Sequence, residues 1–238
     1  YRNNLIVSAN LINECITYGT KVIFTSSMAV YGDQTPPFTE DKRPQPVDPY
    51  GIAKYAVECD LKLAHEQFGL RYNIVRPHNV LGTYQNIWDR YRNVIGIFIR
   101  KTLNGQPILG YGDGEQTRAF SDIKYYMEPF DKLLTGHDGE TFNIGADKHF
   151  TLNEVATTVQ TIAAKYGYEV SIEHGEPRHE VKHAYCDHTK AKTLLNFQDN
   201  TNLTELIESM FVWAMKQPNR KVKDMEYEVT KDIYDYWK

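Results

Sequence analysis

The sequence predicts an α/β fold in which helices alternate with short, buried, parallel strands. Apolar residues recur at helical spacing over residues 3–17 and again over 50–68. A short apolar segment follows each of these helices, at 22–24 and at 71–75. Helix followed by strand is the repeating pattern of layered α/β proteins, so both strands are assigned to one parallel sheet.

The remaining elements follow in chain order. Gly19 and Gly69 end the first two helices. Thr151 and Glu154 form a capping box, which predicts a helix to about residue 166. Further elements are predicted as helices over 94–103 and 202–215 and as strands over 141–144 and 170–173. The glycines at 110, 112 and 114 are interpreted as a loop, and residues 217–238 receive no assignment.

Composition excludes several classes of protein. The chain has 238 residues and a net charge of −4 with no basic stripe, so a nucleic-acid partner is not expected. Cys15, Cys59 and Cys186 are far apart and odd in number, which argues against a disulfide framework or a zinc site and favours a reducing, cytoplasmic location. The longest apolar run, residues 94–99, is too short to cross a bilayer.

A hydroxyl-rich strand end and a Tyr-x-x-x-Lys pattern together indicate a proton-transfer site. The strand at 22–24 leads into Ser27, and the helix at 50–68 carries Tyr50 and Lys54 four positions apart. Residues four apart share one helix face, so the ammonium can stabilise the phenolate. Tyr50 could then exchange a proton with an alcohol whose oxygen Ser27 holds. Tyr-x-x-x-Lys alone is a weak indicator, because most such pairs are ordinary helix neighbours.

Four segments give the chain a family resemblance: Ser26–Gly32, Tyr50–Lys54, Arg76–Gly82 and Asn143–Gly145. In this order they resemble the extended short-chain dehydrogenase/reductase family, specifically its nucleotide-sugar epimerases and in particular the UDP-glucose 4-epimerases. The likeness extends from residue 1 to about 197.

The resemblance implies a Rossmann-like, doubly wound parallel sheet that lacks its N-terminal half, with a smaller α/β substrate-binding domain. Residues 1–80, joined by the strand near 141–145, would form the rest of the NAD-binding domain, and residues 81–238 the nucleotide-sugar-binding domain. The glycine-rich turn that holds a dinucleotide pyrophosphate is absent from the sequence. The chain is therefore expected to be a fragment or one of two pieces, inactive alone, whose strand at 22–24 lacks a neighbour.

The resemblance also assigns roles to individual residues. Tyr50 would be the catalytic acid/base, Lys54 its electrostatic partner and Ser27 the group that orders the substrate oxygen. The cofactor is expected to be NAD, with no metal. Its site matches Asn4, Ser26, Tyr50, Lys54, Pro77 and His78. The substrate site matches Ser27, Asn79, Asn93, Leu109, Tyr111, Arg118 and Arg178. Each also has a plain structural reading, such as a helix cap for Asn93 or a solvated charge for the arginines.

The expected reaction is 4-epimerisation of a UDP-hexose or UDP-N-acetylhexosamine through transient oxidation at C4. Met28-Ala29 stands where the dehydratases and decarboxylases of this family carry an acidic residue, which favours simple epimerisation. Depending on the register, Ala184 or Tyr185 occupies the position that limits the size of the sugar substituent. Ala184 would admit an N-acetyl group and Tyr185 would disfavour it.

Two alternative functions are open. One is a nucleotide-sugar reductase or dehydrogenase of the same family, which would consume its cofactor. The other is a non-catalytic sugar-nucleotide-binding module. In each case the resemblance implies a homodimer formed through helices 3–17 and 50–68.

Overall fold

The centre of the fold is a parallel three-stranded sheet. The structure, a computed structural model, describes residues 2–88, 93–177, 181–218 and 220. Strands β1 (Val22–Thr25), β2 (Tyr72–Pro77) and β7 (Thr141–Ile144) lie in the order β1-β2-β7. All neighbouring pairs are parallel, as the alternation of helices and strands predicted.

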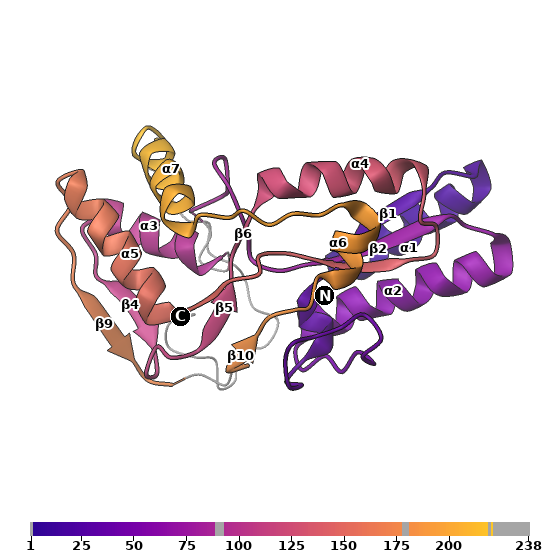
Figure 1. The fold of residues 1–238 in the computed structure, drawn as a ribbon, viewed down its shortest axis with the longest axis horizontal. Helices are drawn as coiled ribbons and strands as arrows, with labels where there is room; N and C mark the ends of the chain where they lie inside the picture. Colours follow the sequence, from indigo (N-terminus) through magenta and orange to yellow (C-terminus); the bar gives the residue numbers. More distant parts are fainter. Residues whose placement is uncertain (1, 89–92, 178–180, 219, 221–238) are drawn as a thin grey trace.

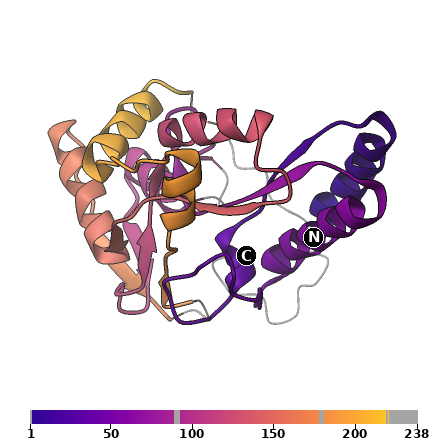
Figure 2. The same ribbon diagram turned by 45° about the vertical axis from the view of Figure 1, so that its right-hand side comes forward.

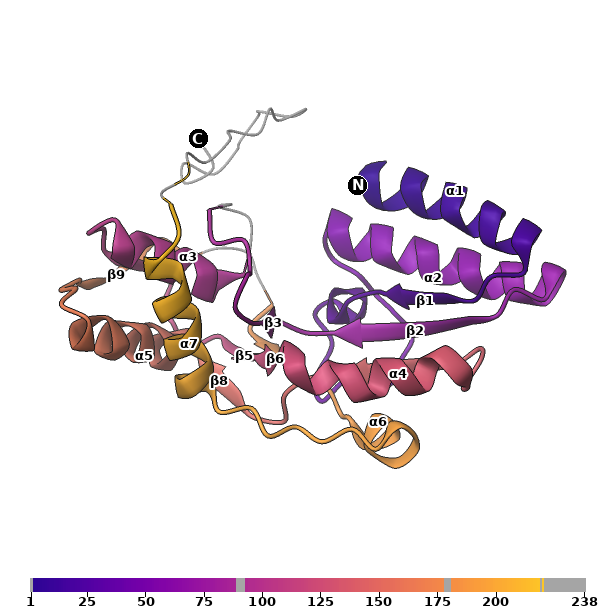
Figure 3. The same ribbon diagram turned by 90° about the horizontal axis from the view of Figure 1, so that it is seen from above.

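Helices cover both faces of this sheet, which gives the layered arrangement seen in Figure 3. Helices α1 (Arg2–Tyr18) and α2 (Pro49–Phe68) pack on one face. Helices α4 (Met127–Thr135) and α6 (Thr189–Leu195) pack on the other face, side by side (Figure 2). Apolar side chains fill the space between each helix pair and the sheet, so the sheet is buried on both faces.

A second group of elements forms its own core at the far end of the molecule (Figure 1). Helices α3 (Val94–Leu103), α5 (Leu152–Lys165) and α7 (Leu203–Met215) pack against β4 (Ile108–Tyr111), which pairs with β9 (Ile172–Gly175).

Short elements join the two parts. Strand β5 (Thr117–Ala119) lies between β10 (His183–Ala184) and β8 (His149–Thr151), and β3 (Val80–Leu81) pairs with β6 (Ser121–Asp122). Two 3₁₀ helices, η1 (Met28–Tyr31) and η2 (Ile123–Tyr126), complete the described elements.

Local sequence patterns predicted the boundaries of several elements correctly. The observed limits of α3 and β7 are those predicted. Helix α5 begins with the predicted capping box, in which Glu154 N donates to Thr151 Oγ1 and Thr151 N donates to the Glu154 carboxylate. Asn202 caps α7 in the same way, by accepting from Glu205 N.

The loop interpretation of residues 110–114 was partly wrong. Gly110 belongs to strand β4, where it pairs with His174 of β9, whereas Gly112 and Gly114 have positive φ and form the turn that follows. Pairing with a strand more than 60 residues away decides this conformation, and local composition carries no sign of it. Helices α4 and α6 were also missed, and the strand predicted at 170–173 lies at Ile172–Gly175.

In the part of the chain that the structure describes, no helix is both long and apolar enough to cross a membrane.

Candidate active site

The site begins where β1 ends, at two serines with different environments. The Ser26 hydroxyl is buried and donates to Glu58 Oε1 at 2.6 Å. The Ser27 hydroxyl caps η1 by accepting from Ala29 N at 3.2 Å. Ser26 therefore anchors the strand end to α2, and any contact it makes with a cofactor would use its backbone. Ser27 is the serine whose side chain faces a cavity.

The first turn of α2 is held against η1. Asp48 caps the helix by accepting from Gly51 N at 2.7 Å, and Pro49 begins it with a φ already suited to helix. A Cβ on Gly51 would lie 2.6 Å from the carbonyl oxygen of Ala29, so glycine is required for this approach. Tyr50, between Pro49 and Gly51, is thereby placed beside the end of β1 with 48% of its surface exposed.

Lys54 lies one turn further along α2 and is fixed by the strand. Its Nζ donates to the carbonyl oxygen of Thr25 at 2.7 Å and lies 4.9 Å from the centre of the Phe24 ring. The same nitrogen is 5.8 Å from the centre of the Tyr50 ring. Partial burial lowers the pKa of Lys54. The ammonium is therefore held beside the tyrosine ring, as the spacing predicted.

A buried ion pair between Arg76 and Glu58 helps to hold α2, the helix that carries Tyr50 and Lys54, in place. Arg76 Nε and Nη2 donate to the two carboxylate oxygens of Glu58 at 3.0 and 2.6 Å, while Nη1 donates to the Tyr31 hydroxyl at 2.8 Å. Both charged side chains are almost completely buried. Because Glu58 is on α2, Arg76 on β2 and Tyr31 on η1, this one pair ties together the three elements around the site.

A cavity of about 400 Å³ opens beside Ser27. It gathers residues from the end of β1, the loop before α2, the end of β2 and strands β5 and β10. The lining residues are Ser27, Met28, Ala29, Gly32, Asp33, Phe38, Val47, Asp48, His78, Asn79, Arg118, Val181 and Ala184. Four predicted site residues, Ser27, His78, Asn79 and Arg118, are brought together here.

Two of these four are held by the backbone of β5 and its surroundings. Asn79 has a φ of 40° and donates from Nδ2 to the Ala119 carbonyl at 2.9 Å. Arg118 donates to the carbonyl oxygens of Thr117, Val181 and Lys182. These bonds fix the guanidinium at the edge of the cavity.

The other predicted residues, Ser26, Tyr50 and Lys54 included, do not belong to the cavity lining. Leu109 and Tyr111 are on β4, Asn93 caps α3 by accepting from Ile95 N, and Asn4 is on α1. Pro77 ends β2 next to His78. Arg178 lies outside the described residues. The roles predicted for these residues stay predictions.

Most of the cavity wall was not identified from sequence. Phe38 and Val181 were given no role in the site by sequence, and they reach the cavity through tertiary packing. Asp48 carried a signal, since Asp-Pro ahead of an apolar helix marks a cap. Ala184 and Tyr185 have different surroundings. Ala184 lines the cavity, whereas the Tyr185 ring stacks on His149 with 4.6 Å between the ring centroids.

Among the described residues, no cluster of three or more His, Cys, Asp or Glu side chains could hold a metal ion.

Comparison with known proteins places this site in a family. The model of the NAD dependent epimerase/dehydratase family matches residues 1–145, the segment that contains Ser27, Tyr50, Lys54, His78 and Asn79. The chain belongs to the NAD dependent epimerase/dehydratase family. The expected resemblance and the Rossmann-like fold are confirmed.

Individual members of the family share about 30% of the residues. A Methanocaldococcus jannaschii protein, provisionally named as a UDP-glucose 4-epimerase, is 32% identical over 91% of this chain and 70% of its own. The UDP-N-acetyl-alpha-D-glucosaminuronate decarboxylase of Bacillus cytotoxicus is 30% identical over 88% of this chain and 68% of its own. The crystal structure of Thermotoga maritima UDP-glucose 4-epimerase with UDP-glucose superposes with a TM-score of 0.82 at 31% identity, over 90% of this chain and 70% of that one.

NAD is the cofactor after which this family is described. Two residues near the ends of β1 and β2 have hydrogen-bonding capacity left for a nicotinamide nucleotide. Lys54 has ammonium hydrogens beyond the one donated to Thr25, and an ammonium with three donors can bind further oxygens. His78 has a buried Nδ1 with no hydrogen-bond partner among the described residues.

Proposed function

We propose that this chain carries the acid/base and sugar-binding groups of a UDP-sugar 4-epimerase. The observation that carries the proposal is the position of Lys54, which lies beside the Tyr50 ring and donates to Thr25 at the end of β1. Two residues after Thr25, Ser27 lines a cavity of about 400 Å³. A phenol with an ammonium beside it, near a strand end that presents a hydroxyl to a cavity, is suited to removing a proton from an alcohol and returning it.

Each group of the chain has a distinct task in this reaction. Tyr50 takes the proton of the C4 hydroxyl at its phenolate oxygen and gives it back after the sugar has presented its other face. Lys54 stabilises the phenolate and binds the cofactor ribose. Ser27 holds the C4 oxygen by a hydrogen bond and so keeps it near Tyr50. The bound nicotinamide supplies reversible oxidation at C4.

The charge of the cavity favours a neutral sugar over a uronic acid. Asp33, Asp48 and Arg118 are the residues of its lining with a full charge at neutral pH, and the guanidinium already binds three carbonyl oxygens. A sugar carboxylate would therefore meet two carboxylates. Met28 and Ala29 add no acid at the point where dehydration or decarboxylation needs one, which supports epimerisation.

The small side chain of Ala184 in the cavity wall favours sugars both with and without a bulky C2 substituent. Ala184 lines the cavity and the Tyr185 ring is turned onto His149, so the small residue is the one that a C2 substituent would approach. The substrates proposed are UDP-hexoses and UDP-N-acetylhexosamines.

Two further pieces of protein complete the proposed enzyme. The edge of β1 away from β2 pairs with no described strand, and a glycine-rich turn that holds the NAD pyrophosphate would add there. Apolar side chains are also exposed on two neighbouring helices, at Ile6, Val7 and Leu11 of α1 and Ile52, Leu63 and Phe68 of α2. A homodimer through α1 and α2 would bury them.

Three assays on the complete protein, with its NAD-binding segment and its nicotinamide in place, test the proposal. Interconversion of UDP-glucose with UDP-galactose, or of their N-acetyl forms, is expected without net change in NADH absorbance. Stoichiometric NADH consumption would point to a reductase instead. Binding of UDP-sugars without turnover of any of these substrates would leave only a binding module and refute epimerisation of them.

A further inference from the structure

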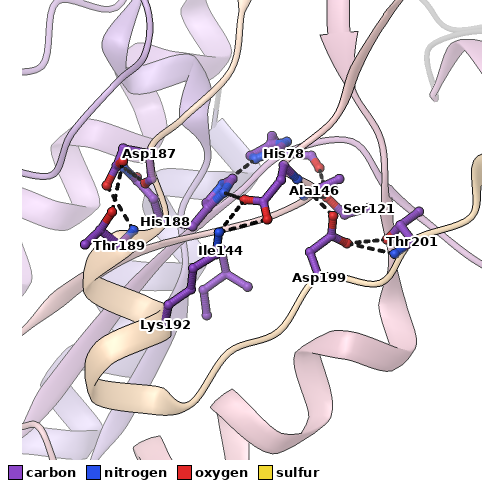
Figure 4. A network of polar contacts seen from close by, with 12 residues as sticks. His78, Ser121, Ile144, Ala146, Asp187, His188, Thr189, Lys192, Asp199 and Thr201 are labelled. Carbon is purple, nitrogen blue, oxygen red and sulfur yellow. Dashed lines mark hydrogen bonds and ion pairs between the residues drawn. The ribbon is translucent and has the colours of Figure 1, made fainter.

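The hydroxyl of Ser121 bridges the ends of the neighbouring strands β2 and β7 (Figure 4). Ser121 is 2% exposed, and its Oγ donates to the His78 carbonyl oxygen at 3.0 Å and accepts from Ala146 N at 2.8 Å. The ladder of parallel pairs between β2 and β7 ends at Pro77 and Ile144. The hydroxyl therefore joins the two strands just past their last pair, and it satisfies a backbone group of each of two buried residues.

Residues 119–121 also hold Asn79, which follows His78 and lines the cavity. Ser121 N donates to the Asn79 carbonyl oxygen at 3.1 Å, and Asn79 Nδ2 donates to the Ala119 carbonyl oxygen at 2.9 Å. The φ of Asn79 is 40°, a left-handed conformation that costs free energy in most residues and that asparagine tolerates. Such a conformation persists where neighbouring contacts fix it. The segment 119–121 therefore determines how the Asn79 amide lies in the cavity wall.

The side chain of His78 is held by separate contacts. His78 Nε2 and His188 Nε2 are 2.9 Å apart, and His188 Nδ1 is 3.1 Å from Asp147 Oδ1 (Figure 4). A Cβ on Gly145 would overlap the His78 ring, so glycine is needed where the imidazole packs beside the end of β7. Loss of the Ser121 hydroxyl would therefore release the backbone at residues 78 and 79 and leave these contacts of the imidazole in place.

Ser121 can act on a ligand only through its neighbours. It is not among the residues that line the cavity, whereas His78 and Asn79 are. Asn79 shares this cavity with Ser27, the residue proposed to hold the C4 oxygen, and an amide side chain can both donate to and accept from sugar hydroxyls. A small displacement of a binding group is enough to weaken its contacts with a ligand.

We propose that Ser121 is a positioning residue that holds the backbone of His78 and Asn79 so that the Asn79 amide binds the sugar of the bound nucleotide. The sugar assignment rests on the proposed function, whereas the contacts of Ser121 with this backbone do not. Without the hydroxyl, the His78 carbonyl loses its donor and Ala146 N loses its acceptor. Asn79 would then be held less precisely against the ligand.

Calorimetry on the complete protein, with its NAD-binding segment and its nicotinamide in place, measures this role. The probe is UDP-glucose or UDP-N-acetylglucosamine, whichever binds the parent protein. Ser121→Ala is expected to weaken its affinity by about 2- to 12-fold, the range for one hydrogen bond. Ser121→Thr keeps the hydroxyl and should retain the affinity of the parent. Ser209→Ala removes a hydroxyl that donates to the Leu206 carbonyl outside the cavity lining, and it should leave the affinity unchanged.

A double-mutant cycle with Asn79→Ala separates positioning from general destabilisation. If Ser121 acts through Asn79, Ser121→Ala should weaken the affinity of the parent and have no further effect in Asn79→Ala. Its effect on the thermal midpoint should persist in both backgrounds, because the His78 carbonyl and Ala146 N lose their partner in either case. Equal losses of affinity in the two backgrounds would overturn the proposal. Parent-like affinity of Ser121→Ala would overturn it as well.

The two proposals fail in different ways. Epimerase turnover together with equal losses in the two backgrounds refutes only the role of Ser121. Binding without turnover refutes only epimerisation, and the cycle then tests Ser121 by affinity alone. Absence of binding of either UDP-sugar by the parent refutes both. Should Ser121→Ala not fold, Ser121→Cys replaces it with the same expected results, because a thiol fills the site but forms only weak hydrogen bonds.

Discussion

At the scale of single residues, Tyr50 differs from two other tyrosines of the chain, Tyr31 and Tyr126, in its exposure to solvent and in its surroundings. Its ring is about half exposed and stands beside Lys54, whereas Tyr31 and Tyr126 are buried and hydrogen-bonded, and burial raises the pKa of both. A phenol that must exchange protons with a ligand needs access and a neighbouring cation. Of these three tyrosines only Tyr50 has both.

Tyr50→Phe should lower kcat of the complete enzyme by about 10²- to 10⁴-fold, the usual value of one general acid/base. The ring and its place on α2 are retained, so KM, thermal stability and association should change little. Steady-state kinetics with a thermal melt measure both. Activity within tenfold of the parent would contradict a proton-transfer role for this hydroxyl.

Ala184→Tyr should narrow the substrate range. The new ring would fill the cavity at the proposed C2 substituent, so kcat/KM for a UDP-N-acetylhexosamine should fall at least tenfold more than kcat/KM for the matching UDP-hexose, a difference of about 1.4 kcal/mol. Ala184→Ser, which adds one small atom, serves as the control and should preserve the ratio. Equal losses for the two substrates would show that residue 184 does not face the substituent.

At the scale of elements, α2 combines the proposed reactive residues with a buried anchor. Tyr50 and Lys54 lie in its first turns, and Glu58 binds Arg76 of β2 one turn later. The Asp48 cap and the glycine contact at Gly51 fix where the helix begins. The site is thus rigid because its helix is fixed at the first turn and again by the ion pair.

Glu58→Gln should destabilise the fold by about 3 kcal/mol, because it leaves the Arg76 guanidinium buried without its counter-charge. Urea unfolding at constant m-value measures this as a lower midpoint. Glu66→Gln, on an exposed position of the same helix, should change the midpoint little. If the two variants were equally stable, the buried pair would not anchor α2.

At the scale of the whole molecule, the buried His78–His188 pair links stability to pH. The pKa of His78 is about 3 in the folded chain and about 6.5 in an unfolded one, so the unfolded state binds more protons between these values. The free energy of unfolding therefore includes the full contribution of neutral His78 above pH 6.5. This contribution decreases as the pH falls below that value. Asp147, with a lowered pKa, begins to contribute only near pH 4 and below.

Between pH 6 and 4 the free energy of unfolding should decrease with a slope that includes up to about 1.4 kcal/mol per pH unit from this one group. His78→Phe should remove that component while other histidines continue to titrate. Denaturant unfolding at several pH values, compared between the parent and His78→Phe, measures the difference. Parallel pH profiles would show that His78 does not titrate abnormally.

Local sequence determined the elements that lie beside the site and the types of group that they carry. Helix periodicity, caps and glycine stops fixed α1, α2, α3, α5 and α7, and the spacing of Tyr50 and Lys54 put both on one helix face. These features depend on interactions within a few residues, so composition and spacing suffice to predict them.

Only the tertiary structure decided which residues share the cavity. Phe38, Arg118, Val181 and Ala184 come from separate strands and loops, and the choice between Ala184 and Tyr185 depends on a stacking contact with His149. The His78–His188–Asp147 chain likewise joins positions up to 110 residues apart. Such groupings follow from strand order and long-range packing, which local residue patterns do not encode.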